Sequence, residues 1–586
     1  MNRKHKWSAL ALLICLALTL GGCSGGGVTS QIVPDPVEET DPTEQYYQTY
    51  NEQSEGYFAP DTGVQDAPVV PAPVSLDQIR AAAEQQVALD PDYEQASIYT
   101  TIARGDVNIG LVVGEDMNIN PLRCPYLDMM NLNTLVYEGL VALDSTMQPV
   151  PQLADRWEAD GDTWTFTLRS NVYFQDGQLL TPEDVIASWQ EIQRNSGSYW
   201  YPLVSLIDSI TVRDESTIRV KGISGYMMLY AMSFPIVQRQ SIEYAQPIGT
   251  GPYVIAQYQT STAVRLEPNP LWWKKSTDQI QSIVGLCYGT AKGAIQAMEM
   301  GEIDTLASEY PTASANRNLS DRITHDYSTL TYECIVPNLS NKLLRRFAVR
   351  QALMYAIDRS TLANTIYTGM VQESEVPVVP GTWLYEPQAA QYNYNPELAL
   401  QILYDDGWSD PDGDGVLSKE IDGEIVPLSF KLMTYDRGTT STRSEAITAI
   451  KAQLELVGVK VTTATFKLGE AYDRMNEGDF DLSLCAFELS EIPNLANLFS
   501  STGKQNYSRY KETEMDKLLR TAYDARSADA LQSAMSDVQL KIVEDLPMFG
   551  LFFRNGVLSS SVPMQGLDAG LRRGYVLRGI ANVTLN

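Results

Sequence analysis

The chain has 586 residues, with 73 Asp or Glu against 43 Lys or Arg, and its formal net charge is -30 at pH 7. This acidity disfavours a nucleic-acid partner, because binding phosphates requires a basic surface. Only two histidines and six cysteines are present, so histidine-rich metal centres, histidine-dependent triads and a disulfide framework are not expected. We expect no cofactor. The four cysteines of the body are expected to be buried free thiols, although an exported chain could also form a bridge: Cys124, Cys287, Cys334 and Cys485.

The first residues have the features of an export signal. Three basic residues precede an apolar run from Trp7 to Leu20, which is too short to span a bilayer comfortably. Leu20-Gly21-Gly22-Cys23 resembles the lipobox of bacterial lipoproteins, in which the cysteine becomes the acylated first residue. We therefore predict a lipoprotein signal peptide over residues 1–22, lipidation of Cys23 and anchoring at the outer, extracytoplasmic face of the cell membrane. The alternative is an ordinary signal peptide with an incidental cysteine.

An acidic, proline-rich segment follows, and we assign it to residues 23–102. Between Ser24 and Tyr99 it holds fourteen acidic residues against the single base Arg80, with few large aliphatic side chains. Such a segment buries too little apolar surface to offset the entropy of ordering. We predict a mostly disordered linker, in which residues 75–87 have the apolar spacing of a short helix.

From residue 103 onward, helix and strand patterns alternate, which favours an α/β fold of at least two lobes. Residues Trp164–Arg169 alternate apolar and polar side chains and predict a half-buried strand. Thr181 and Asp184 have the spacing of a capping box and predict a helix start. Its apolar face comprises Val185, Ile186, Trp189 and Ile192. A further helix is predicted within 345–359. Another is predicted from Asn395 to Gly407 and carries Leu398, Ile402 and Leu403. A third is predicted from Ala446 to Gly458, with a strand directly after it.

Several motifs occur in the order and spacing seen in one family. They are Asn120-Pro121-Leu122, Tyr137-Glu138-Gly139-Leu140-Val141, Pro151-Gln152-Leu153-Ala154, Thr163–Arg169, Phe174-Gln175-Asp176-Gly177, Thr181–Val185, Gly249-Thr250-Gly251-Pro252-Tyr253, Asn269-Pro270-Leu271-Trp272-Trp273, Val349–Arg359, Gly407-Trp408 and Asp545-Leu546-Pro547. Together they resemble the solute-binding proteins of peptide-type ABC importers. The resemblance implies an α/β, two-lobed, periplasmic-binding-protein-like clamshell of the large peptide-binding type.

The resemblance also implies how the chain is divided. It would cross between the lobes near Gly285–Gly289 and return near Pro547–Arg554. Lobe one would comprise residues 103–288, completed by residues 550–586, and lobe two would comprise residues 289–549. Two strand-like crossings would let the lobes hinge without unfolding either one.

The implied function is the capture of peptides in an interlobe cleft and their delivery to an ABC permease and its ATPase, without catalysis. Peptides in such a cleft are held largely by strand addition, and their charged termini need partners. The alternatives are a binder of another solute, such as a sugar or a nickel chelate, and a peptide-sensing surface receptor. An enzyme is the rival class, and a two-carboxylate glycosidase is the form of it that needs no local motif.

In oligopeptide-binding members of the family, an aspartate in a Trp-x-Ala-Asp-Tyr type segment holds the ammonium group of the ligand. The matching stretch here is Cys485–Pro493. If Pro493 is aligned with the family proline, Leu489 falls at the aspartate position, and Phe487 or Ala486 replaces the tryptophan. The chain therefore departs from the family pattern at the residue that holds the ligand ammonium group in oligopeptide-binding members.

Two glutamates of this stretch could replace the aspartate. Glu488 or Glu491 would supply the negative charge after a small shift of register. The alternative is that both face solvent beyond a strand from Phe480 to Leu484.

Other residues are candidates for lining the ligand cleft. Asn338 lies in the family segment that leads into the helix predicted within 345–359, and Arg350 of the same segment is predicted to be structural. Aromatic side chains offer apolar faces with a polar tip, and the alternative is that they belong to the core or the rim: Trp383, Tyr385, Tyr392 and Tyr394.

Asp410, Asp412 and Asp414 resemble the front of a calcium-binding loop, in which alternating carboxylates and a glycine turn surround a hard cation. The twelfth position of such a loop is Ile421 here, where a calcium loop has a glutamate. A solvated acidic turn is the alternative to a calcium site.

Overall fold

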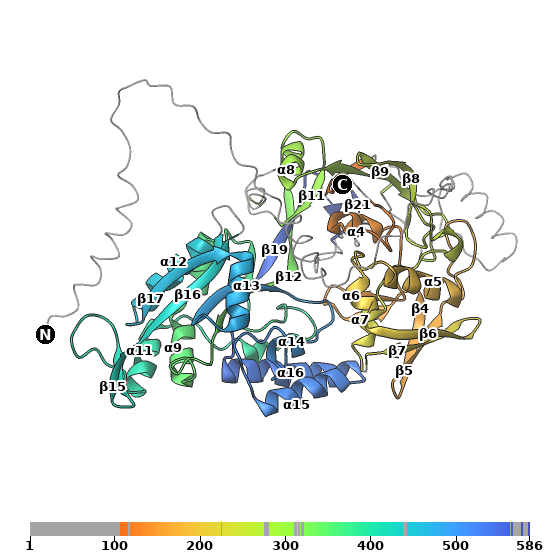
Figure 1. Cartoon of the computed structure of the whole chain (residues 1–586). Helices are drawn as coiled ribbons and strands as arrows, with labels where there is room; N and C mark the ends of the chain where they lie inside the picture. The colour runs from red at the N-terminus through yellow and green to blue at the C-terminus, as the bar shows by residue number, and fades with distance from the viewer. Residues whose placement is uncertain are drawn as a thin grey trace, which may run out of the picture. The chain divides into compact units, whose positions relative to one another are not determined.

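The computed structural model describes residues 106–114, 118–223, 225–274, 280–309, 313, 317, 321–436, 442–562, 564–565, 576–577, 580 and 584–585. The predicted signal peptide, the lipidation site Cys23 and the linker with its short helix lie outside the described residues. Among the described residues, helices and strands alternate along the chain, as predicted for an α/β fold (Figure 1). None of the helices in these ranges combines the length and apolar character needed to cross a membrane.

The largest element is an eleven-stranded sheet. Ten strands follow the order β17-β16-β18-β12-β19-β11-β1-β10-β9-β8, and β13 pairs with β19 beside this path. The strands are β1 (Asp106–Val112), β8 (Tyr253–Gln259), β9 (Ala263–Pro268), β10 (Ser282–Tyr288), β11 (Thr305–Ser308), β12 (Ile323–Pro337), β13 (Val371–Glu373), β16 (Ser429–Asp436), β17 (Lys460–Lys467), β18 (Leu482–Glu488) and β19 (Phe549–Ser560).

Two long strands join the two ends of this sheet. β12 and β19 lie side by side and antiparallel, as Figure 1 shows. β12 also pairs with β18, and β19 also pairs with β11. β11 pairs with β1 of predicted lobe one, so β11 belongs to the lobe-one part of the sheet. We therefore propose that the chain first crosses between the lobes within β12, which is later than the predicted Gly285–Gly289. The division into lobes remains a prediction.

The other sheets are small. One has four strands in the order β4-β5-β7-β6, and three are two-stranded. Side chains along β5 alternate between half-buried and buried, which confirms the strand predicted at Trp164–Arg169. The strands are β2 (Val141–Leu143), β3 (Pro149–Pro151), β4 (Ala154–Asp160), β5 (Thr163–Leu168), β6 (Ile207–Asp214), β7 (Thr217–Gly222), β14 (Ser418–Ile421), β15 (Glu424–Pro427), β20 (Met564–Gln565) and β21 (Thr584–Leu585).

Helices cover the sheets, and α12 and α13 both pack on β16 and β17. The helices are α4 (Leu127–Asn133), α5 (Pro182–Gln193), α6 (Tyr201–Val204), α7 (Met228–Ala231), α8 (Ala291–Glu299), α9 (Phe347–Ala356), α10 (Arg359–Thr365), α11 (Pro396–Asp405), α12 (Thr442–Glu455), α13 (Leu468–Glu477), α14 (Ala496–Phe499), α15 (Thr513–Asp524) and α16 (Ala528–Asp545), with 3₁₀ turns η1 (Arg239–Ser241) and η3 (Pro387–Ala389).

The capping predictions hold at the starts of these helices. The Asp184 carboxylate accepts the backbone N–H of Thr181 at 2.9 Å, which confirms the capping box of α5. Asn395 accepts the N–H of Leu398 at 3.0 Å at the start of α11. Of the apolar residues named for this helix, Leu403 is buried, Ile402 is half-buried and Leu398 is exposed.

The helix predicted within 345–359 is shorter than expected. α9 ends at Ala356, because Ile357 has an extended backbone. Asp358 then caps a new helix, α10, by accepting the N–H of Thr361 at 2.9 Å. A local side-chain bond therefore divides what the apolar spacing indicated as one element.

The cysteines of the body lie mostly in the core. Cys124, Cys334 and Cys485 are buried and Cys287 is half-buried, and all four are free thiols. Burial raises the pKa of the Cys124 thiol to about 12. This thiol therefore stays protonated and unreactive at neutral pH.

Candidate functional site

β18 has a strand on both sides for only part of its length. It pairs with β12 from Leu482 to Glu488. With β16 it pairs only at Leu482 and Ser483. Among the described strands, residues 485–488 therefore have a partner on the β12 side alone. A half-paired strand of this kind offers backbone donors and acceptors to an added strand.

Glu488 is the last residue of β18. The expectation that the strand ends at Leu484 was wrong, since pairing with β12 continues to Glu488. Glu488 is exposed, and its carboxylate accepts the hydroxyl of Thr331, directly opposite on β12, at 2.7 Å. The half-paired part of β18 therefore ends in an exposed carboxylate.

The other residues of the predicted ligand segment differ in exposure. Phe487 is buried and stacks on Tyr507, with 6.1 Å between ring centres. Leu489 is half-buried and its N–H donates to the carbonyl of Leu330 at 2.9 Å. Glu491 is buried, so the alternative of two solvent-facing glutamates does not hold for it. Leu489 has no charge, which leaves Glu488 as the exposed acid of the segment.

Trp383 connects segments that the sequence assigns to different lobes. Its indole N–H contacts the hydroxyl of Tyr230 at 3.0 Å and the carbonyl of Met147 at 3.2 Å. Its ring meets the ring of Tyr226 edge to face, with 6.0 Å between centres. The backbone N–H of Tyr226 in turn donates to the carbonyl of Ala525 at 2.5 Å. Trp383 thus lies at a contact between predicted lobe one and predicted lobe two.

The remaining aromatic candidates have separate environments. Tyr385 is half-buried, and burial raises the pKa of its hydroxyl. The hydroxyl of Tyr392 donates to the carbonyl of Val543 at 2.9 Å, inside the core. Tyr394 is exposed. Of these three, Tyr385 is neither held in the core by a hydroxyl bond like that of Tyr392 nor exposed like Tyr394.

Asn338 and Arg350 both bond to backbone carbonyls. The buried amide of Asn338 donates to the carbonyls of Gly478 and Phe480 at 3.0 and 2.9 Å. The guanidinium of Arg350 donates to the carbonyls of Leu344, Arg345, Asp545 and Leu546. The predicted structural role of Arg350 is confirmed, and Asn338 fixes the turn after β12 through its own amide.

A second feature, which the sequence did not single out, is a buried carboxylate beside an open cavity. Glu138 is 3% exposed and accepts hydrogen bonds from four neutral side chains: Gln152, Thr250, Trp272 and Trp273. The adjoining cavity is small, with a volume of about 30 Å³, and is lined in part by Asn133 and Trp200. Among the described residues, the side-chain amide oxygen of Asn133 and the indole nitrogen of Trp200 are buried without a hydrogen-bond partner. Glu138, Trp272 and Trp273 belong to motifs that carry the family resemblance, but the motifs alone gave these residues no role.

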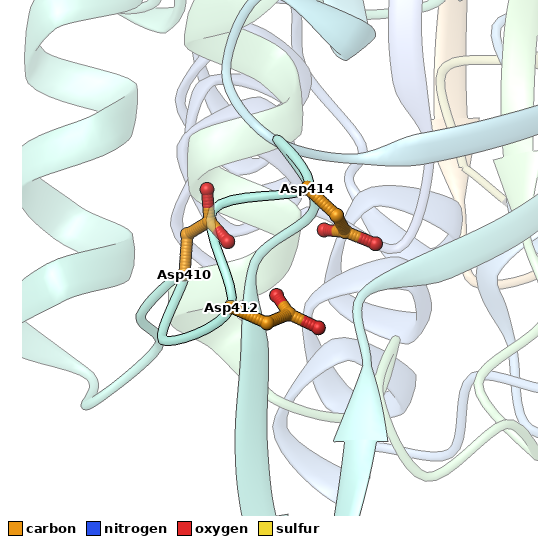
Figure 2. Close-up of side chains that lie close together, drawn as sticks. All are labelled: Asp410, Asp412 and Asp414. Carbon is orange, nitrogen blue, oxygen red and sulfur yellow. The ribbon is translucent and has the colours of Figure 1, made fainter.

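Asp410, Asp412 and Asp414 lie together on an exposed loop, as Figure 2 shows. One carboxylate oxygen of each lies within 4.8 Å of the other two. The oxygens of Asp410 also accept the N–H groups of Gly413 and Gly415, at 2.9 and 3.1 Å. The loop is thus stabilised by its own backbone, and calcium binding stays a prediction.

Comparison with known proteins shows which family the chain belongs to. Residues 148–508 match the family described as bacterial extracellular solute-binding proteins, family 5 Middle. The chain belongs to this family. The predicted relationship and the α/β periplasmic-binding fold are therefore confirmed, and the family is one of binding proteins.

Relatives of this family 5 protein have different ligands. The oligopeptide-binding protein AppA of Bacillus subtilis is 26% identical over 498 residues, covering 79% of this chain and 88% of the relative. The murein tripeptide binding protein MppA, in its unliganded open form, superposes with a TM-score of 0.72 at 18% identity, over 83% of this chain and 98% of the other. NikZ from Campylobacter jejuni, in complex with Ni(L-His), gives a TM-score of 0.58 at 19% identity, over 82% of this chain and all of the other. At these identities the structural likeness shows the fold alone.

Proposed function

We propose that this family 5 protein is the lipid-anchored, extracytoplasmic substrate-binding subunit of an ABC importer. In this proposal it captures peptides in a cleft between the two lobes and delivers them to a permease and its ATPase. The relatives named for oligopeptides support the ligand class. In this proposal the protein retains its ligand without chemical change, and the description of its family as solute-binding proteins supports this.

The half-paired part of β18 carries the proposal of a peptide ligand. A peptide added beside residues 485–488 would form main-chain hydrogen bonds on the side where the pairing with β16 has ended. Backbone bonds of this kind are independent of the peptide side chains. We therefore expect broad sequence specificity.

Glu488 is our candidate for the ligand ammonium group. It takes over the role of the family aspartate, one residue before the position that Leu489 occupies in the alignment. Its carboxylate lies at the end of the half-paired strand and is oriented by the hydroxyl of Thr331. An ammonium enclosed without such a partner would be costly to desolvate.

The test is native mass spectrometry of the full-length chain in detergent with a synthetic library of di- to pentapeptides. We expect stoichiometric retention of free peptides. Glu488→Gln is expected to lower their affinity about tenfold, because it removes the charge from one charge-assisted hydrogen bond. N-acetylated peptides should bind equally weakly to both proteins.

The matched control is Asp473→Asn, which removes one exposed acid on α13. This variant is expected to bind like the unmodified chain. Equal affinity of Glu488→Gln and the unmodified chain for free peptides would exclude Glu488 as the ammonium partner. Failure to retain any peptide, or release of hydrolysed peptide, would exclude the proposed function.

A further inference from the structure

Two buried cysteines lie directly opposite each other on neighbouring strands of the large sheet. Cys334 on β12 pairs with Cys485 on β18 in the antiparallel register. Cys334 is 0% exposed and Cys485 is 3% exposed. Opposite residues of an antiparallel pair point to the same face of the sheet, so the two side chains share one face. In the structure both are free thiols, which is the reduced form of the pair.

The backbone spacing of this pair fits a disulfide. The N–H of Leu489 donates to the carbonyl of Leu330 across the same two strands. Hydrogen-bonded pairs recur at every second residue of an antiparallel ladder. Cys334 and Cys485 are an even number of residues along each strand from that bond, so they also form a hydrogen-bonded pair. The Cα atoms of such a pair are about 5.5 Å apart, a separation that is common in disulfides.

The two thiols also interact with each other. The pKa of the Cys334 thiol is raised, first by burial and then by its hydrogen bond with the thiol of Cys485. Thiols buried in this way stay protonated and unreactive in the folded chain. A bond between them is therefore made during folding, before this part of the sheet closes.

The other cysteines of the body have no such arrangement among the described strands. Cys287 on β10 lies opposite Leu111 of β1, and Cys124 lies outside the strands. The family is described as extracellular solute-binding proteins, and disulfides form and persist outside the cytoplasm. Two small apolar side chains could fill the same space in the core, so oxidation of the pair is the property that separates the two roles.

We propose that Cys334 and Cys485 form a disulfide in the exported protein. The oxidant is another disulfide, R–S–S–R, of a small molecule or of a thiol oxidoreductase. The thiolate of one cysteine attacks it, forms a mixed disulfide and releases one R–S⁻. The thiolate of the second cysteine then attacks the sulfur of the first and releases the other R–S⁻. The two cysteine protons pass to the released thiolates, so the protein loses two electrons and two protons and the oxidant gains them.

The bond holds β18 at the point where its second partner strand ends. β18 pairs with β16 only at Leu482 and Ser483, and Cys485 is the first residue of the half-paired part, 485–488. A covalent link to β12 at this point restrains the start of the half-paired part without help from β16. It also closes the loop between residues 334 and 485, which lowers the entropy of the unfolded chain. We therefore expect the oxidised chain to be the more stable form.

The test is peptide mapping of the full-length chain, isolated in detergent from an exporting bacterium and alkylated in denaturant before any reduction. Trypsin cleaves after lysine and arginine, so it releases Cys334 within residues 323–342 and Cys485 within residues 475–504. We expect mass spectrometry to find these two peptides joined by a disulfide that a reductant separates. Alkylation of both cysteines in the unreduced chain, or a bridge from either one to a different cysteine, would overturn the proposal.

Urea unfolding measures the effect of the bond, with the chain refolded either in oxidised glutathione or in dithiothreitol. We expect the midpoint of the oxidised chain to be higher by about 1 M urea. Cys485→Ala should abolish this difference between the two conditions. Cys124→Ala is the matched control, because Cys124 is equally buried and lies outside the pair, and it should preserve the difference. Equal midpoints of the oxidised and reduced unmodified chain would overturn the stabilising role, and the peptide map decides the bond itself even if a variant does not fold.

Discussion

Replacing Glu333 of β12 with alanine is expected to lower the free energy of unfolding by about 3–5 kcal/mol, the cost of leaving a buried charge without its partner. Glu333 is 0% exposed, and its carboxylate accepts Nη2 of Arg443 and Nε of Arg554, both at 2.7 Å. Two guanidinium groups would then face each other with no carboxylate between them. Urea unfolding at pH 7 measures the loss. Glu470→Ala is the control, because Glu470 is an exposed acid on α13 paired with Arg474, and it should cost less than about 1 kcal/mol. A Glu333→Ala loss as small as that of the control would refute the role of this carboxylate in stability.

The same carboxylate predicts a dependence of stability on pH. Burial acts to raise the pKa of Glu333, but Arg443 and Arg554 outweigh it and the pKa lies below the ordinary value of 4.5. The stabilising contribution is therefore complete above 4.5 and is lost as the pH falls through the lower, folded-state pKa. The difference in unfolding free energy between the unmodified chain and Glu333→Gln should shrink in acid. A constant difference from pH 7 to 3 would contradict this expectation.

The second large effect is expected at Gly550 on β19, where alanine should destabilise the fold by about 3 kcal/mol, at the upper end for overpacking. A methyl group there would lie 2.0 Å from the Tyr332 hydroxyl oxygen and 2.3 Å from the Glu375 carbonyl oxygen. The second contact is with backbone and cannot be relieved by a rotamer change. The expected readout is a lower midpoint in thermal and urea unfolding.

Gly469→Ala is the matched control for this substitution. Nothing lies within 4 Å of the position that its side chain would occupy, and the residue belongs to helix α13. Alanine there should stabilise the chain by about 0.5–1 kcal/mol, because glycine loses more conformational freedom in a helix. If Gly550→Ala had the same unfolding midpoints as the control, the close packing of β19 would be disproved.

Features that depend on neighbouring residues could be predicted from the sequence. The capping box of α5 needs only residues three apart, and the alternation in β5 needs only its own side chains. The break between α9 and α10 was missed, because the bond from Asp358 to the N–H of Thr361 competes locally with an apolar stripe. The end of β18 was also missed, because pairing with β12 carries the strand on to Glu488.

The candidate site was predictable only in part. The family alignment indicates the segment Cys485–Pro493, because this segment is continuous in sequence, but it places Leu489 at the aspartate position and reaches Glu488 or Glu491 only after a small shift of register. On the strand beside β18, the contacts of Glu333 join it to Arg443 and Arg554, which lie 110 and 221 positions away in the chain. No spacing rule connects such residues, and only the order β16-β18-β12-β19 brings them to one face. The structural role of Arg350 could be predicted from the sequence, because Arg350 lies within one motif.

The two long strands that join both ends of the large sheet have a consequence for how the protein melts. β12 and β19 share a hydrogen-bonded ladder that continues into β18 on one side and β11 on the other. If the part next to β18 or the part next to β11 frayed, the edge of the other part would be exposed. The two parts therefore form one cooperative unit. Calorimetry should therefore record a single heat-absorption peak for the folded body, with equal van't Hoff and calorimetric enthalpies, even though the chain is long enough for two independent cores.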